Sequence, residues 1–140
     1  MDKEIIATNQ APAAIGPYSQ GTRTADFIFT AGQLGIVPGT KDLGADIESQ
    51  TRQALENLQA VLKAGSSCLD HVLKTTVFML DLGEFPRMNA VYGAFFAKNP
   101  PARSTVQVAA LPMGARVEIE AIALACGCAG GPEECTCDGC

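Results

Sequence analysis

The sequence predicts an α+β fold in which two helices pack on one face of a mixed β-sheet. Segments rich in β-branched and aromatic residues alternate with two segments of helical periodicity. The chain has 140 residues and no low-complexity body, so one domain is expected. We expect this domain at residues 1–125 and a cysteine-rich tail at residues 126–140.

Strands are expected where β-branched and aromatic residues gather between turn formers. The segment that begins at His71 is apolar on both faces, which is typical of a central strand. The last two expected strands are joined by a short connection, so we expect them to be neighbours. The expected strands are residues 4–8, 26–31, 71–80, 103–109 and 116–125.

The first helix is expected from Asp46 to Gly65. Leu55, Leu58 and Leu62 recur at three- and four-residue spacing and predict its buried stripe. Asp46 is a typical N-cap, and a glycine such as Gly65 commonly follows the last turn. These signals predict a helix of about five turns that packs on the sheet.

A second helix is expected over residues 83–98, because Pro86 is tolerated only in a first turn and residues 99–101 end the helix. Two helices cover only one face of the sheet. The other face is expected to remain apolar, and a single domain rarely leaves such a face exposed to solvent. We therefore expect a homo-oligomer that closes the open faces against each other. The apolar positions are Val106, Val108, Ile119 and Ala121 or their neighbours.

The composition argues against two classes of partner. The formal net charge of −5 provides no basic field for a nucleic acid. No apolar run approaches the roughly 20 residues of a membrane helix.

The first residues are charged and mixed in sign, unlike a signal peptide. Together with the lack of a cysteine framework in the body, this predicts a reducing, cytoplasmic location.

Arg103 and Glu118 are the leading candidate site residues. They lie on two strand-like segments that are otherwise almost uncharged. An arginine can bind a carboxylate through two parallel hydrogen bonds, and a glutamate can position or deprotonate a water. From spacing alone, an ordinary ion pair across the sheet is the more economical explanation.

Three further residues are candidates, each with an ordinary structural alternative. Tyr18 follows a rigid Gly-Pro turn that can aim its ring into a cleft, but a half-buried loop tyrosine is the commoner case. Asn89 lies near the edge of the apolar stripe of the second helix, where most asparagines are solvated. His71, the only histidine, is more simply the end of a loop than a base. No metal motif, nucleophile elbow or Cys–His pairing is expected in the domain.

Five segments together resemble a known family. The pair Pro-Ala-Arg-Ser and Val-Glu-Ile-Glu is the most specific part of the match, which extends over about residues 3 to 125. On these segments the chain resembles the RidA family (YjgF/YER057c/UK114) of reactive-intermediate deaminases. The segments are residues 13–21, 30–33, 89–92, 101–104 and 117–123.

The resemblance implies a chorismate-mutase-like α+β fold and a homotrimer with clefts between subunits. It implies hydrolysis of 2-imino acids, such as 2-iminobutanoate and 2-iminopropanoate, to 2-keto acids and ammonia. No cofactor is expected, since an imine carbon is already electrophilic. Orientation, one acid–base group and charge stabilisation should suffice.

The resemblance also implies roles for individual residues. Arg103 would bind the substrate carboxylate, Glu118 would hold the attacking water, and Tyr18 would complete the catalytic set. Many relatives have serine at the position of Ala31 and cysteine at that of Thr105, so we expect an altered substrate range. The substrate-binding residues implied are Arg103, Asn89, Gly32, Ala31 and Thr105.

Two other functions remain open at this stage. A trimeric module that binds a keto acid or a similar carboxylate without turnover would use the same arginine. RNA cleavage, an activity of some family members, is disfavoured by the acidic charge. The tail is either a metal-binding or redox appendage or a segment without a defined role, because closely spaced thiolates suit Zn²⁺ or Cu⁺. Its candidate ligands are Cys126, Cys128, Cys135, Cys137 and Cys140.

Overall fold

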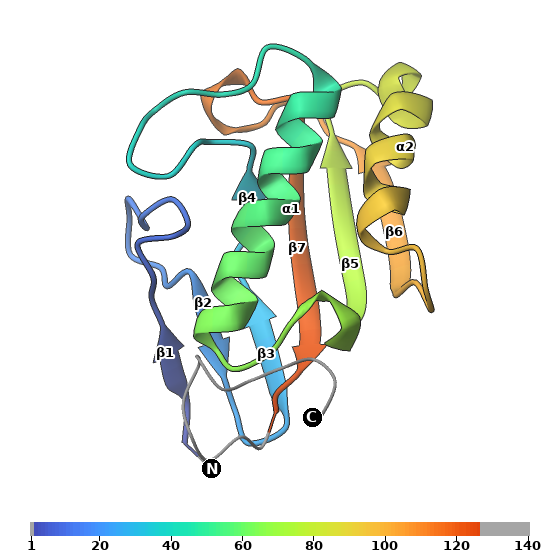
Figure 1. The fold of residues 1–140 in the computed structure, drawn as a ribbon. Helices are drawn as coiled ribbons and strands as arrows, with labels where there is room; N and C mark the ends of the chain where they lie inside the picture. Colours follow the sequence, from blue (N-terminus) through green and yellow to red (C-terminus); the bar gives the residue numbers. More distant parts are fainter. Residues whose placement is uncertain (1, 127–140) are drawn as a thin grey trace.

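The computed structural model describes residues 2–126. Its strands form one mixed sheet of order β1-β2-β3-β7-β5-β6, with β4 also paired to β7. Helices α1 (Ile47–Ala64) and α2 (Phe85–Phe95) both lie on one face of this sheet (Figure 1). The predicted α+β architecture is therefore confirmed. The strands are β1 (Glu4–Ile6), β2 (Gly21–Arg23), β3 (Phe27–Thr30), β4 (Gln33–Leu34), β5 (Val72–Met79), β6 (Ala102–Gln107) and β7 (Val117–Leu124).

The order of the last three strands corrects a prediction. Strands β6 and β7 are not neighbours, because β5 lies between them. Strand β5 pairs in parallel with β6 and antiparallel with β7. A parallel pair needs a crossover, and α2 supplies it, so β6 is placed at the outer edge of the sheet. The short β6–β7 connection then passes the end of β5, where Val108 N–H donates to Met79 O at 2.9 Å.

Helix α1 begins as the sequence predicts. The Asp46 side chain accepts a hydrogen bond from Ser49 N–H at 2.8 Å, and Ser49 Oγ accepts one from Asp46 N–H at 3.3 Å. This reciprocal pair satisfies N–H groups that a helix start leaves open. The helix ends at Gly65, where an added Cβ would lie 2.5 Å from Ile6 Cδ1. A larger residue there would have to push the end of the Ile6 side chain aside.

Three short elements were not expected as such. The chain forms 3₁₀ turns at η1 (Leu69–His71), η2 (Leu82–Glu84) and η3 (Pro112–Gly114). Strands β2 and β4 were also missed, because at three and two residues they are too short to show alternation.

Among residues 2–126, no helix is long and apolar enough to cross a membrane.

The two faces of the sheet differ sharply. On β7, Val117, Ile119 and Ala123 are fully buried against the helices, so the prediction that Ile119 and Ala121 line the open face is wrong. The alternate residues point to the opposite face, which neither α1 nor α2 covers (Figure 1). Large apolar side chains there stay about two-fifths exposed within the single chain. They include Phe27, Phe29, Leu73, Val106 and Leu124.

Candidate functional site

Arg103 is held in a defined position at the outer edge of the sheet. It lies on β6 and faces α2, where its Nη1 donates to Asn89 Oδ1 at 2.7 Å. Its guanidinium carbon lies 4.7 Å from the centre of the Tyr92 ring and 5.4 Å from that of Phe85. These cation–π contacts and the one hydrogen bond orient the guanidinium group of Arg103. Most of its five N–H donors remain available for an anion.

Thr105 adds a polar atom beside this arginine. Two residues further along β6, it points to the same face as Arg103. Its Oγ1 is buried and has no hydrogen-bond partner within the described residues. A buried hydroxyl without a partner carries a desolvation cost of about 1–3 kcal/mol. A partner from outside the chain, such as a ligand oxygen, would remove that cost. We call Arg103, Asn89 and Thr105 the arginine half-site.

Glu118 lies on β7 and points to the open face. Its register neighbours are Leu34 on β4 and Phe78 on β5. Burial raises the pKa of the Glu118 carboxyl above its ordinary value, and the nearby charge of Glu120 raises it further. Such a carboxyl can hold a water and exchange a proton with it.

Gly32 closes one side of Glu118. A Cβ added to Gly32 would lie 2.7 Å from Glu118 Cδ and 2.7 Å from Oε1, so only glycine permits this close approach. Ala31 precedes it, and its N–H donates to Gln20 O at 2.8 Å. We call Glu118, Gly32 and Ala31 the glutamate half-site.

The structure does not bring the two half-sites together within one chain. Arg103 faces the helices, whereas Glu118 faces the open side of the sheet, with β5 between their strands. The alternative of an ordinary ion pair between them is therefore wrong.

Tyr18 contacts neither half-site in the described chain. It is 53% exposed, and its hydroxyl accepts a long hydrogen bond of 3.4 Å from Ile15 N–H. The loop that carries it is anchored by buried Gln20, whose amide nitrogen donates to Thr8 O at 3.0 Å and Pro12 O at 2.8 Å. An anchored loop that presents exposed Tyr18 and Ile15 is suited to contact a second molecule.

Sequence reasoning missed the aromatic residues beneath Arg103. Phe85 and Tyr92 were assigned only to the buried stripe of the second helix. Their spacing from Asn89, four residues before and three after, places all three on one helix face. Tyr92 is held by a 2.7 Å hydrogen bond between its hydroxyl and Thr75 Oγ1, and burial raises its pKa. Helical spacing around Asn89 was the signal that could have identified this platform.

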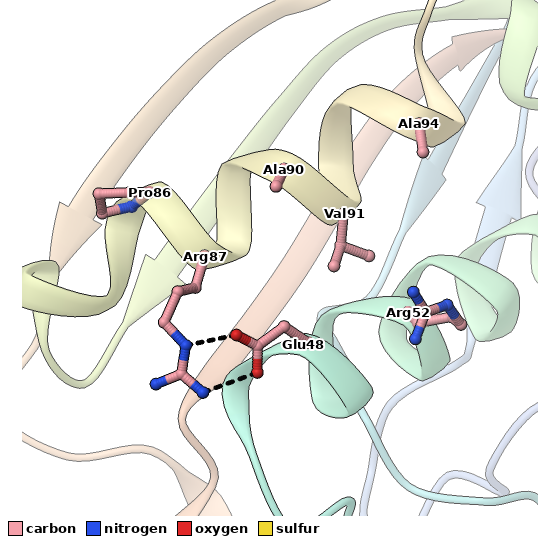
Figure 2. A pocket seen from close by; sticks show the side chains of 7 residues that line it. All are labelled: Glu48, Arg52, Pro86, Arg87, Ala90, Val91 and Ala94. Carbon is pink, nitrogen blue, oxygen red and sulfur yellow. Dashed lines mark hydrogen bonds and ion pairs between the residues drawn. The ribbon is translucent and has the colours of Figure 1, made fainter.

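A separate groove lies between the two helices. Figure 2 shows its apolar side, with Ala90, Val91 and Ala94 on α2. Arg87 on α2 and Glu48 on α1 form an ion pair across it. The groove contains none of the residues predicted for the site.

The first residue of the expected tail contacts the domain. The Sγ atom of Cys126 lies 3.0 Å from Nδ1 of His71, a contact that the sequence did not predict. Among residues 2–126 no group of three or more potential metal ligands occurs. The other predicted tail ligands lie outside the described residues. They are Cys128, Cys135, Cys137 and Cys140.

Comparison with known proteins identifies the family. The family model described as Endoribonuclease L-PSP, which represents the YjgF/RidA proteins, matches residues 8–125. The chain belongs to the RidA family. A relative from Escherichia coli K12, named 2-iminobutanoate/2-iminopropanoate deaminase, is 47% identical over 124 residues, covering 86% of this chain and 97% of that protein.

Two further RidA-family relatives extend this result. The chloroplastic Reactive Intermediate Deaminase A of Arabidopsis thaliana is 45% identical over 122 residues; the match covers 86% of this chain and 65% of that longer protein. The solved structure of Escherichia coli TdcF with bound serine has a TM-score of 0.85 and 43% identity, with 88% of this chain and 99% of that chain covered. The fold is therefore that of solved RidA-family proteins.

Proposed function

We propose that this chain is a hydrolytic deaminase of 2-imino acids, with 2-iminobutanoate and 2-iminopropanoate as substrates. The proposal rests on the oriented Arg103 guanidinium. A buried Thr105 hydroxyl with no hydrogen-bond partner among residues 2–126 lies on the same face of the strand. A 2-imino acid has a carboxylate for this guanidinium and a C=N bond on the adjacent carbon. The name of the Escherichia coli relative supports the same substrate class, and that of the Arabidopsis relative supports deamination.

The proposal includes a homotrimer with its sites between subunits. Two features support it. The open sheet face exposes large apolar residues such as Phe29 and Val106, which association would bury. The arginine half-site lies at the sheet edge, so a neighbouring subunit can place its glutamate half-site opposite. Exposed Tyr18 would then approach the completed cleft from its anchored loop.

The chemistry follows from these positions. Arg103 binds the substrate carboxylate and orients the imine carbon. Ionised Glu118 takes a proton from a water, whose oxygen bonds to the carbon of the protonated imine as the C=N electron pair moves to nitrogen. Glu118 then gives this proton to the amine nitrogen of the carbinolamine. The C–N bond breaks as the hydroxyl oxygen forms the C=O bond, and the hydroxyl proton passes to the departing ammonia, which leaves as ammonium. A glutamate whose pKa is raised by burial suits both steps. No cofactor enters the reaction.

Two positions bear on the range of substrates. Ala31 places a methyl group where many family members carry a hydroxyl, and Thr105 places a hydroxyl where many carry a thiol. The Thr105 hydroxyl can donate to a carboxylate oxygen and so replace part of the lost polarity. We expect activity to be retained, with selectivity for small side chains that differs from that of relatives.

Kinetics with two variants test the proposal. Purified protein should accelerate ammonia release from freshly generated 2-iminobutanoate. Glu118→Gln should abolish turnover while keeping keto-acid binding, measured by calorimetry, because its amide cannot accept the proton. Arg103→Ala should weaken that binding as well, since the carboxylate loses its fork.

The alternative is a trimer that binds a small carboxylate without turnover. It predicts keto-acid binding that depends on Arg103 but no acceleration of imine hydrolysis by the unmodified chain. That result would exclude the deaminase. Wild-type activity in Glu118→Gln would exclude the role given to Glu118.

A further inference from the structure

Thr75 is a fully buried polar residue beside the arginine half-site, and the proposed deaminase chemistry does not use it. It lies on β5 and pairs in parallel register with Arg103 on β6. Residues that pair in register point to the same face of a sheet, and neighbouring strands lie about 4.8 Å apart. Thr75 and Arg103 therefore stand side by side on the face that the helices cover.

Tyr92 on α2 contacts both of these residues. Its hydroxyl lies 2.7 Å from Thr75 Oγ1, and the centre of its ring lies 4.7 Å from the guanidinium carbon of Arg103. The ring also packs against Phe96, with 4.7 Å between the two ring centres. Tyr92 is thus held at its hydroxyl end by Thr75, while the arginine lies over the ring itself.

The hydrogen bond limits how the ring can move. Both hydroxyls belong to buried side chains, so a ring that tilted away from Thr75 would leave two buried polar groups unpaired, which is unfavourable. The guanidinium of Arg103 rests on this ring and is held from the helix by Asn89 Oδ1 at 2.7 Å. The orientation of Arg103 therefore depends on a residue that lies beneath it in the core.

The ring also stays neutral. Burial raises the pKa of Tyr92 above its ordinary value of 10.0, although the hydrogen bond to Thr75 and the charge of Arg103 act against this rise. A phenolate would pair with Arg103 and compete with a substrate carboxylate. A neutral ring attracts the guanidinium through its quadrupole, which leaves the full positive charge of Arg103 for an anion.

We propose that Thr75 is a positioning residue for substrate binding: its hydrogen bond fixes the Tyr92 ring, and the ring holds the Arg103 guanidinium in place for the substrate carboxylate. The inference rests on the proposed function, which supplies the substrate. Thr75 itself touches neither the substrate nor the reacting atoms. Because the carboxylate keeps its charge throughout hydrolysis, a misplaced guanidinium weakens binding of the ground state and the transition state about equally.

Three variants test this role. Thr75→Val removes the hydroxyl and keeps nearly the same shape. It should raise the KM for 2-iminobutanoate and the Kd for 2-oxobutanoate, measured by calorimetry, about three- to tenfold, while kcat stays within about twofold. Thr75→Ser retains a hydroxyl and should restore both constants. Tyr92→Phe keeps the ring, loses the other hydroxyl and should resemble Thr75→Val.

A matched control separates this effect from the loss of any buried hydroxyl. Thr51 on α1 is as buried as Thr75, and its Oγ1 has no hydrogen-bond partner among residues 2–126. Thr51→Val should therefore leave KM, kcat and Kd unchanged. Thermal unfolding of each variant checks that it folds, and Tyr92→Phe and Thr75→Ser decide the question if Thr75→Val does not.

The positioning role and the deaminase fail in different ways. If the unmodified chain is active and both Thr75→Val and Tyr92→Phe keep its KM and Kd, the positioning role is overturned and the deaminase stands. A lower unfolding temperature with unchanged KM would show only a core hydrogen bond. A lower kcat at unchanged KM, or no recovery in Thr75→Ser, would also overturn the role.

Binding decides the remaining cases. If the unmodified chain binds 2-oxobutanoate without hydrolysing the imine, the deaminase fails, and the Kd values of the Thr75 variants still decide the positioning role. An unmodified chain that neither hydrolyses 2-iminobutanoate nor binds 2-oxobutanoate overturns both.

Discussion

Adding a methyl group at Gly32 should disable the glutamate half-site without unfolding the protein. The new Cβ would lie 2.7 Å from Glu118 Cδ, whereas ordinary contacts begin at 3.4 Å. Glu118 must therefore retreat by about 0.7 Å. A shift of about 1 Å at a reacting group can cost about 100-fold in rate. We expect Gly32→Ala to lower kcat/KM for 2-iminobutanoate by roughly 10- to 100-fold.

Stability should respond differently from activity. The backbone of Gly32 lies outside the left-handed region, so alanine fits its conformation. The clash is with the end of a flexible side chain, which can move aside. We expect the midpoint of thermal unfolding to change by no more than a few degrees.

A second substitution separates displacement from other effects. Glu118→Asp shortens the side chain and relieves the clash with a methyl at position 32. Steady-state kinetics of both single variants and the double variant should then be non-additive, with the double variant losing less than the product of the single losses. Losses that multiply independently would refute the reasoning, as would wild-type kcat/KM in Gly32→Ala.

Three further predictions concern stability. Burial and Glu120 raise the folded-state pKa of Glu118 above its ordinary value of 4.5. The stability that the protonated carboxyl gives to the folded state is therefore fully present below pH 4.5, and it is lost as the pH rises through the folded-state pKa. Glu118→Gln should thus raise the unfolding temperature at pH 7 but not near pH 4; an equal gain at both would contradict this. Gly35→Ala should destabilise the fold by about 1–3 kcal/mol in urea unfolding, since its Cβ would lie 2.5 Å from the backbone oxygen of Gln50. Gly93→Ala, which meets nothing within 4 Å on α2, should instead stabilise by about 0.5–1 kcal/mol, and a loss there would argue against the helix assignment.

Local signals in the sequence predicted the helices well. Asp46 and Gly65 bound α1 as expected, because capping and apolar periodicity act over a few residues. Strand β7 was also placed closely, at Val117–Leu124. The short strand β4 was not predicted. Two residues are too few to show a period, and the pairing of β4 with β7 is a contact between segments far apart in the sequence.

The candidate residues were chosen from residue type and family resemblance, and their roles stay predictions. The tertiary structure supplied what surrounds them. The Phe85 and Tyr92 rings lie at Arg103, Gly32 contacts Glu118, and the buried Thr105 hydroxyl has no hydrogen-bond partner in the described part of the chain. No spacing rule anticipated these, since each depends on how α2 and β4 pack on the sheet.

The sequence by itself determined the family, the helices and the alternation that turns Arg103 and Glu118 to particular sides of their strands. Only the tertiary structure decided strand order, which puts β5 between β6 and β7 and leaves these two residues on opposite faces. It also decided that His71 meets Cys126. The physical reason is the same in each case. Periodicity is a property of residues close together in the sequence. Strand order and contacts between side chains depend instead on crossovers and on packing between segments far apart in the chain.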